Sequence, residues 1–465
     1  MSVAKALCAL FVALALASCN AAPTAQHADP YAPHDYVQLH HPDWARSAVI
    51  YQINTRQFTP EGTFKAAQAQ LPRLKALGVD ILWLMPIHEI GVKNRKGSLG
   101  SPYSVRDYYS VNHEFGTLDD LKAFISAAHA LGMHVILDWV ANHTAWDNPL
   151  VTQHPDWYER DWKGDFHPTP WFDWSDIIDL NYDQPALRRY MTDAMKYWVR
   201  DVGFDGFRAD TAGFVPLDFW ENARRELDEI KPVFMLAEWE QRDVHARAFD
   251  ATYAWTWGQA VESIARGHAN VGALFGYYSG NESAWPRDAD RMTFLSNHDW
   301  NAWEATEFER YGPALHAAMV LQVVGEGMPM IYNGQEAGYN HRLAFFERDP
   351  IRWREHENGA LYQRLFALKH ENSALWNGAA GAQMISVVNS APDKVLSFVR
   401  RNDREQIFAV LNFSGSRQRV NFKDALPLGA YTEYFSNQSV TIDANTSLSL
   451  APWDYRVFIM SRTAH

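Results

Sequence analysis

The chain has 465 residues, of which 47% are apolar, and its formal net charge at pH 7 is −13. This length exceeds one small core and fits a large domain followed by a smaller one. The acidic balance argues against nucleic acid or an anionic membrane surface as a partner. The chain also contains 19 Trp, and flat aromatic rings suit stacking on the apolar faces of sugars.

Residues 1–18 have the features of a secretory signal. Lys5 precedes an apolar run over 6–17, which is too short to span a membrane. The run ends in Leu-Ala-Ser-Cys, which resembles the lipobox of bacterial lipoprotein signals. That resemblance implies acylation of Cys19 and, from Asn20 after it, an outer-membrane address. We therefore expect a lipid-anchored protein of the bacterial cell envelope, facing the periplasm or the cell surface, with a periplasmic or secreted protein as the alternative.

Strand and helix patterns alternate along most of the chain after a tether over 19–43, which is rich in Ala, Pro and His. Strands are predicted at 48–54, 79–86, 133–140, 205–209, 232–238, 291–296 and 328–333. Helices are predicted at 63–77, 118–131, 185–202, 216–230, 313–324 and 359–371. No Gly-rich dinucleotide motif follows the first strand. This α/β alternation favours a closed (β/α)₈ barrel, which we place at 44–381, over an open sheet.

Two segments depart from the alternation. Residues 144–183, rich in Trp, Asp, His and Pro, follow the third strand and indicate an irregular lobe inserted over one face of the barrel. From 382 to 465 the pattern changes to short strands separated by turns, at 384–388, 394–400, 406–412, 417–421, 431–435 and 455–460. We expect an all-β C-terminal domain there, in the form of a sandwich.

The fourth predicted strand ends in Arg208 and Asp210. Alternation places both side chains on the same side of an extended backbone. A cation one pleat away should lower the pKa of Asp210 and keep it ionised, as a nucleophile requires. The same pair could equally be a structural ion pair at a strand end.

Other strands also deliver polar side chains at their carboxyl ends, where a barrel places its active site. Asn142 and His143 follow the strand predicted at 133–140, and Glu238 ends the strand at 232–238. Asn297-His298-Asp299 follow the strand at 291–296. Burying several carboxylates together is costly, so the cluster indicates function. With no nucleophile elbow and no phosphate loop, a carboxylate site in an aromatic-rich chain points to glycoside cleavage.

These segments together resemble the α-amylase family, glycoside hydrolase family 13. The four short signatures of that family are matched in order by DWVANH (138–143), GFRADT (206–211), the glutamate of FMLAEW and SNHD (296–299). The resemblance implies three catalytic carboxylates: Asp210 as nucleophile, Glu238 as general acid/base and Asp299 as stabiliser of the transition state.

The same resemblance implies roles for the neighbouring side chains. Arg208 orients Asp210, His143 and His298 hydrogen-bond the sugar, and Tyr103 stacks under it; Asp138 is the structural acid of the first signature. Glu238 lies on an apolar strand without an obvious cation, so desolvation and the neighbouring carboxylates should raise its pKa.

The sequence departs from the starch-cutting members of the family after the nucleophile. Where these often carry Lys-His, this chain has Phe214, which can neither ligate a metal nor donate a hydrogen bond. The lobe ends in IIDLNYD (177–183), closer to the oligosaccharide-acting branch. A calcium site on Asn142 would lack two usual partners, although Asp173 and Asp176 could substitute. We expect no required cofactor and no metal ligand set, with calcium left open.

The leading interpretation is a retaining hydrolase of α-glucosidic bonds in starch-derived or maltooligosaccharide substrates, acting through a covalent glucosyl-enzyme. One alternative keeps the three carboxylates but transfers the glucosyl unit to another sugar, which the apolar segment around Phe214 favours. Another is a lipid-anchored glycan-binding protein with an inactive barrel, although all three carboxylates are present.

Overall fold

We describe the fold from a computed structural model, which covers residues 31–32, 34–423 and 427–460. The chain divides into two units, Met1–Tyr36 and Val37–His465, and every helix and strand below belongs to the second. The expected signal over 1–18 and Cys19 lie outside the described residues. Within the described ranges, no helix is both long and apolar enough to cross a bilayer.

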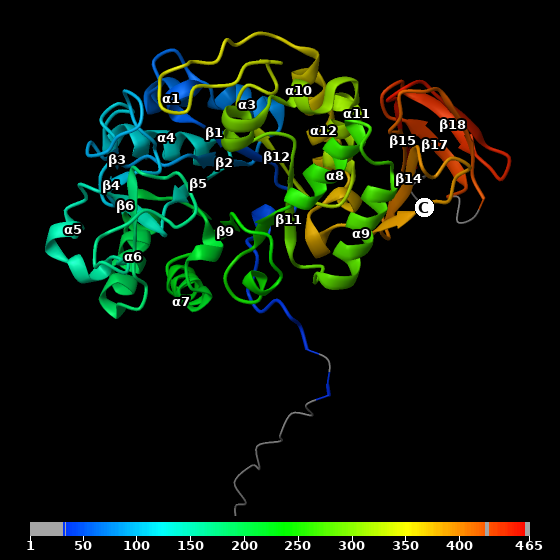
Figure 1. Ribbon diagram of the computed structural model, residues 1–465. Helices are drawn as coiled ribbons and strands as arrows, with labels where there is room; N and C mark the ends of the chain where they lie inside the picture. Colours follow the sequence, from blue (N-terminus) through cyan, green and yellow to red (C-terminus); the bar gives the residue numbers. More distant parts are fainter. Residues whose placement is uncertain (1–30, 33, 424–426, 461–465) are drawn as a thin grey trace, which may run out of the picture. The chain divides into compact units, whose positions relative to one another are not determined.

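Eight parallel strands close into a barrel, which confirms the expected architecture (Figure 1). Around the barrel they follow chain order: β1 (Ile50–Ile53), β2 (Ile81–Leu84), β5 (His134–Trp139), β8 (Gly206–Ala209), β9 (Phe234–Ala237), β10 (Ala251–Tyr253), β11 (Asp290–Phe294) and β12 (Met328–Tyr332). The sequence did not predict strand β10, which has only three residues and lies directly before a helix. A run this short carries no clear periodicity.

The helices of the barrel domain are α1 (Thr55–Phe58), α2 (Phe64–Gln68), α3 (Leu71–Leu77), α4 (Leu118–Ala130), α5 (Leu150–Gln153), α6 (Pro185–Tyr197), α7 (Leu217–Asp228), α8 (Trp255–Ala265), α9 (Gly272–Ala284), α10 (Glu307–Tyr311), α11 (Leu315–Val324) and α12 (Glu357–Glu371). The helix predicted over 63–77 is two helices, α2 and α3. The second ends at Gly78, whose φ of +100° caps it in the left-handed conformation that glycine favours.

Side chains along the barrel strands point alternately into two apolar layers. Ile50, Trp83 and Phe294 belong to a cluster inside the barrel, whereas Tyr51 and Leu82 belong to the larger cluster that includes the surrounding helices. The barrel is therefore a filled core, and only side chains at its carboxyl-terminal rim are available to a ligand.

Two short antiparallel ribbons rise from this rim. Strands β3 (Glu89–Ile90) and β4 (Val105–Asp107) pair after β2, and β6 (His143–Ala145) pairs with β7 (Ile177–Asp179) after β5. The second ribbon and α5 form the lobe that the sequence placed after the third barrel strand.

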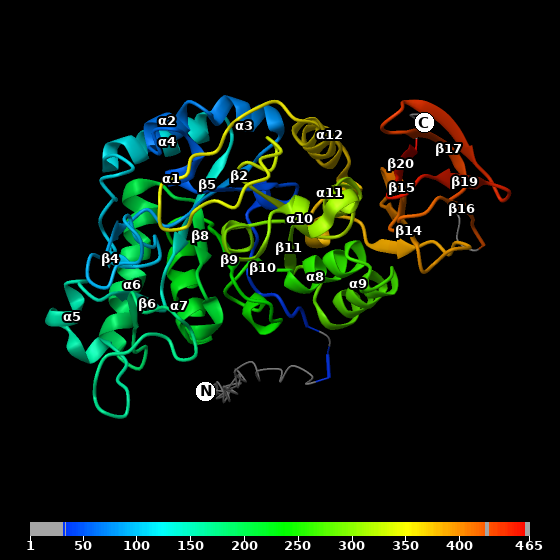
Figure 2. The same ribbon diagram turned by 45° about the horizontal axis from the view of Figure 1, so that its top comes forward.

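The C-terminal domain is antiparallel β, as expected, and its strands lie together in Figure 2. One sheet has the order β13 (Met384–Ser386), β14 (Val395–Arg401), β15 (Gln406–Asn412), β20 (Tyr455–Met460), β17 (Gly429–Glu433) and β18 (Gln438–Ile442); β16 (Gln418–Asn421) pairs with β19 (Ser447–Leu450). Val420 and Leu450 of the small sheet share a core with Phe408 and Phe458 of the large one. The two sheets therefore pack face to face.

Candidate active site

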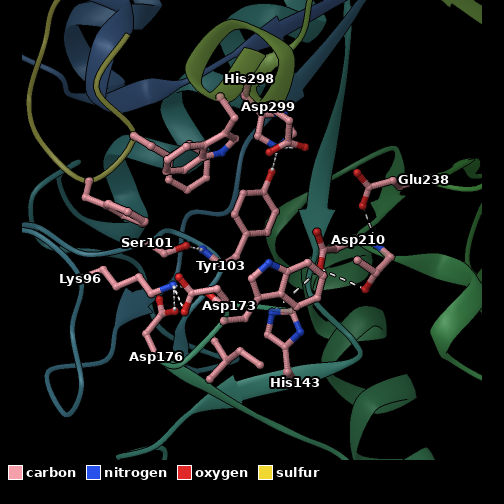
Figure 3. A pocket seen from close by; sticks show the side chains of 16 residues that line it. Lys96, Ser101, Tyr103, His143, Asp173, Asp176, Asp210, Glu238, His298 and Asp299 are labelled. Carbon is pink, nitrogen blue, oxygen red and sulfur yellow. Dashed lines mark hydrogen bonds and ion pairs between the residues drawn. The ribbon is translucent and has the colours of Figure 1, made fainter. Parts of the chain in front are cut away.

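A cavity of about 470 Å³ lies at the carboxyl ends of the barrel strands (Figure 3). Six of the seven site residues that the sequence proposed line it: Tyr103, His143, Asp210, Glu238, His298 and Asp299. The seventh, Arg208, is fully buried beneath them. The structure therefore brings all seven together, although they come from five different strand ends.

Strand β8 positions the centre of the site. It begins at Gly206, where a Cβ atom would lie 1.9 Å from the carbonyl oxygen of Phe234 on β9, so only glycine allows the strands to approach this closely. Two residues further on, Arg208 points into the barrel, with its guanidinium over Trp83 and Tyr253 at 5.1 and 5.7 Å. These rings hold the cation in one orientation.

Arg208 contacts three carboxylates at once. Its Nη1 donates to Asp138 Oδ1 at 2.7 Å and to Asp210 Oδ1 at 3.0 Å. Its Nη2 forms an ion pair with Glu238 Oε1 at 2.7 Å. The expectation that Glu238 has no cation nearby is therefore wrong. The planar guanidinium reaches the neighbouring strand as well as its own, which the alternation along one strand does not reveal.

Burial dominates the electrostatics of the two central carboxyls. Burial, reinforced by Asp138 and opposed by Arg208, raises the pKa of Asp210 to about 6. Arg208 lowers the pKa of Asp210, as expected, but the expected net lowering is wrong, because one cation shared by three carboxylates does not offset the desolvation. Burial, opposed by Arg208 and reinforced by Asp210, raises the pKa of Glu238 to about 7. The expected rise for Glu238 therefore holds.

The turn after Asp210 fixes the second oxygen of Glu238. Thr211 adopts a left-handed backbone with φ of +42°, which is uncommon for a residue with a branched side chain. This conformation directs its backbone N–H to Glu238 Oε2, at 2.7 Å. By contrast, Oδ2 of Asp210 receives only a long contact from the Thr211 hydroxyl, at 3.4 Å. That oxygen is therefore the least engaged of the four.

A hydrogen-bond chain fixes His298 as a neutral donor. Gln52 accepts from the backbone N–H of His298 at 3.2 Å and directs its amide nitrogen to Nδ1 at 2.7 Å. Because Nδ1 then accepts, the proton lies on Nε2, which is 2.7 Å from the Tyr103 hydroxyl and 3.2 Å from Asp299 Oδ2. Burial lowers the pKa of His298 well below its usual value.

Tyr103 and Asp138 complete this chain. The Tyr103 hydroxyl donates to Asp138 Oδ2 at 2.9 Å, and the Trp83 indole donates to the same oxygen at 3.0 Å. Asp138 is fully buried and does not line the cavity. It holds Arg208 and Tyr103 in place and so has the position of a structural acid.

His143 faces the nucleophile candidate from the other side. Its Nε2 is 4.0 Å from Asp210 Oδ2, and its Nδ1 accepts from the Asn142 amide at 3.2 Å. Burial lowers the pKa of His143. The ring is therefore neutral and can donate through Nε2 to a ligand beside Asp210.

An aromatic surface follows the turn after Asp210, outside the lining of the cavity. The Phe214 ring, 40% exposed, lies 5.7 Å from Trp239 and 5.8 Å from Phe172. Gly213 makes this packing possible, because a Cβ there would lie 2.0 Å from the Trp239 ring. The sequence identified Phe214 as a departure, and the structure shows it as part of an apolar surface.

The candidate calcium ligands named from the sequence have different partners in the structure. The amide nitrogen of Asn142 donates to Thr169 Oγ1 and to Asp179 Oδ1, at 3.2 and 3.1 Å. Asp173 and Asp176 lie instead near the ammonium of Lys96. Among the residues that the structure describes, no group of three or more His, Cys, Asp or Glu could hold a metal.

Several residues at the site were not identified from the sequence, among them Gln52, which is buried and bonds His298, and three residues that line the cavity. Gln52 could have been, since a glutamine within the apolar run 48–53 is unusual. Lys96 and Phe345 come from loops and Trp303 from a short helical turn over Trp300–Glu304, so no local pattern places them at the site.

Comparison with known proteins assigns the chain to a family. Residues 48–374 match the family model for the α-amylase catalytic domain, and 385–457 match the maltogenic amylase C-terminal domain. The chain belongs to the α-amylase family of glycoside hydrolases. Its second match places the C-terminal β domain with that of maltogenic amylases.

Individual relatives agree with this assignment. α-Amylase MalA of Haloarcula japonica is 31% identical over 411 residues, covering 83% of this chain; the chain spans only 58% of that relative's length. A cyclomaltodextrin glucanotransferase of Geobacillus stearothermophilus is 25% identical over 452 residues, covering 84% of this chain and 60% of its own length. Among solved structures, the noncanonic maltogenic α-amylase AmyB of Thermotoga neapolitana has a TM-score of 0.82 at 30% identity, covering 90% of this chain and 99% of its own.

Proposed function

We propose that the chain is a retaining glycoside hydrolase that cleaves α-glucosidic bonds in starch-derived oligosaccharides. The observation that carries this is the buried set of Asp210, Glu238 and Arg208 beside the open carboxylate of Asp299. Asp210 attacks the anomeric carbon through Oδ2, its less engaged oxygen, while Glu238 protonates the departing glycosidic oxygen. Glu238 then removes a proton from water, whose oxygen replaces Asp210 and releases the sugar with its original anomeric configuration.

The neighbouring residues prepare these two steps. The Nε2–H groups of His143 and His298 face the region beside Asp210 and Asp299, where they can hydrogen-bond sugar hydroxyls. Asp299, whose side chain is 41% exposed, offers a carboxylate to the positive charge that develops on the sugar ring. Tyr103 lines the cavity between them and offers its ring to the sugar.

A Glu238→Gln variant tests the assignment. Glutamine keeps the shape but cannot donate a catalytic proton, so kcat on maltooligosaccharides should fall by about 10²–10⁴-fold. The first product that the wild-type chain releases should be the α-anomer, as measured by NMR. Normal turnover in the variant, or an inverted first product, would contradict the proposal.

Glucosyl transfer is the second candidate. The aromatic surface formed by Phe214, Trp239 and Phe172 can stack an acceptor sugar and exclude water from the same position. Incubation with concentrated maltotriose separates the two, since transfer produces longer oligosaccharides and hydrolysis only shorter ones.

We also propose that activity requires no calcium, because Asp173 and Asp176, the acids that could replace the missing calcium ligands, lie at the Lys96 ammonium. Dialysis against a chelator should leave activity and Tm unchanged. A loss that added calcium restores would contradict this.

For location, we propose a lipid anchor at Cys19 in the bacterial envelope. The support is the Leu-Ala-Ser-Cys sequence after the apolar run. A Cys19→Ser variant should lose incorporation of labelled palmitate and appear in the soluble fraction, whereas the wild type should sediment with membranes.

A further inference from the structure

Lys96 lies on the loop between β3 and β4 and joins it to the lobe. Its ammonium donates to the backbone carbonyl of Asp173 and lies 3.7 Å from Asp176 Oδ1 and 3.9 Å from Asp173 Oδ1. The Asp176 side chain is 7% exposed, so this pair is partly shielded from water, whereas Asp173 is fully exposed and adds little. All three residues line the cavity.

The same loop is also joined to the segment after β12. Leu99 N donates to the carbonyl of Phe346 at 3.1 Å, and Ser98 N donates to Glu347 Oε1 at 2.7 Å. Gly97, with φ of +65°, allows this contact because a Cβ there would lie 2.5 Å from the Cβ of Phe346. Phe345 and Phe346 line the cavity beside Lys96.

Three segments that are far apart in the sequence therefore meet at one end of the cavity. We call this the end wall and define it as Lys96, Asp176 and Phe346. Arg56 stabilises its base, because Nη1 donates to the carbonyls of Gly100 and Phe345 at 2.9 and 3.4 Å. Arg56 is buried on α1, directly after β1, so these hydrogen bonds connect the base of the wall to the barrel domain.

The chemistry of Glu238 tells which end of the substrate meets the wall. A general acid must face the departing oxygen, so the acceptor part of the substrate extends on the side of Glu238. Figure 3 shows Lys96 and Asp176 on the opposite side of Tyr103 from Glu238. The donor part of the sugar chain, which ends in the non-reducing terminus, therefore extends toward the end wall.

We propose that the end wall closes the donor side, so that the enzyme takes α-glucan chains by their free non-reducing ends and removes short units. This inference rests on the proposed function and specifies its substrate. Lys96 and Asp176 supply a donor and an acceptor for the hydroxyls of the terminal sugar, and Phe346 covers it. A cavity of about 470 Å³ is in the range of small-ligand pockets and suits a short donor segment.

The test compares two maltoheptaosides, one with a free and one with an ethylidene-blocked non-reducing end. Chromatography measures the loss of each substrate over time. The full wild-type chain should cleave the blocked substrate at least about tenfold more slowly, because the block meets the wall. Lys96→Ala opens the wall and should raise the blocked-to-free rate ratio about tenfold. Lys96→Met, which keeps the apolar stem, should raise it less.

Lys93→Ala is the matched control, since Lys93 lies on the same loop, contacts Trp146 and does not line the cavity; its ratio should equal the wild-type value. Equal wild-type rates on both substrates would overturn the end wall while leaving the proposed function intact. An unchanged ratio in both Lys96 variants would likewise overturn it. A wild-type chain that cleaves neither substrate would overturn the proposed function and this inference with it.

Discussion

The Nη2 atom of Arg208 lies 2.7 Å from Oε1 of Glu238, so the guanidinium that binds the nucleophile candidate also binds the acid candidate. The two carboxyls therefore titrate around one shared cation. Ionisation of either one makes ionisation of the other less favourable, because a single positive charge cannot compensate both. This arrangement favours a state with one proton between them, as a retaining mechanism needs.

Replacement of Arg208 by Lys tests this shared role. A single ammonium cannot contact Asp138, Asp210 and Glu238 together, so kcat/KM should fall by about 10²–10³-fold. The acid limb of the pH profile should also move to higher pH, because a point-charge ammonium shared among the three carboxylates compensates Asp210 less than the direct guanidinium contact does. Circular dichroism checks that the variant is folded. A folded Lys variant with an unshifted acid limb would contradict the shared role.

The pH dependence of the wild type follows from the same pair. Activity requires Asp210 without its proton and Glu238 with one. The rate should therefore rise with pH through about 6, the pKa of Asp210, and fall through about 7, the pKa of Glu238. Initial rates of kcat/KM from pH 4 to 9 measure both limbs. An acid limb near pH 4, typical of an exposed carboxyl, would show that burial does not govern Asp210.

The Phe214 ring should control the balance between transfer and hydrolysis. An aromatic contact contributes roughly 0.5–1.5 kcal/mol beyond burial, so Phe214→Ala should lower the ratio of transfer to hydrolysis by about 2–10-fold. Chromatography of products from concentrated maltotriose measures the ratio. Trp162→Ala is a suitable control, since this lobe residue is 88% exposed and is not part of the surface formed by Phe214, Trp239 and Phe172. Equal effects of both variants would argue against a specific acceptor contact.

The sequence predicted the barrel because its strands are continuous apolar runs. It proposed six of the seven candidate site residues through signatures at strand ends, and Tyr103 from the loop after the second strand. It failed where the structure depends on pairing between strands. The register that aligns Arg208 with Leu236 brings Glu238 within reach of the guanidinium, and neither strand alone contains that information. The end wall could not be predicted from the sequence either, because Lys96, Asp176 and Phe346 meet only after three loops fold over the barrel.

Asp205, at the start of β8, should stabilise the barrel in a pH-dependent way. Burial opposes the ionisation of Asp205, but its cationic and hydrogen-bonding partners lower its pKa below the usual range. These partners are His129 at 2.7 Å, the Lys231 ammonium at 2.8 Å and His134. Since the folded pKa lies below the unfolded value of about 3.9, the stabilisation is present above that pH and is lost as pH falls further. Asp205→Asn should therefore reduce the free energy of unfolding by about 2 kcal/mol at pH 7.

Urea unfolding of the Asp205→Asn variant and the wild type at pH 7, 5 and 3 measures this contribution. The difference in unfolding midpoint should not narrow between pH 7 and 5, because Asp205 is ionised in both states over that range and its imidazole partners can only gain positive charge as the pH falls. It should narrow at pH 3, where the unfolded carboxyl takes up a proton. Asp201→Asn serves as the control, since Asp201 lies at the surface, where its carboxylate pairs with the neighbouring Arg200; its midpoint should stay close to that of the wild type. A difference for Asp205→Asn that is as large at pH 3 as at pH 7 would mean that the residue acts through packing and not through its charge.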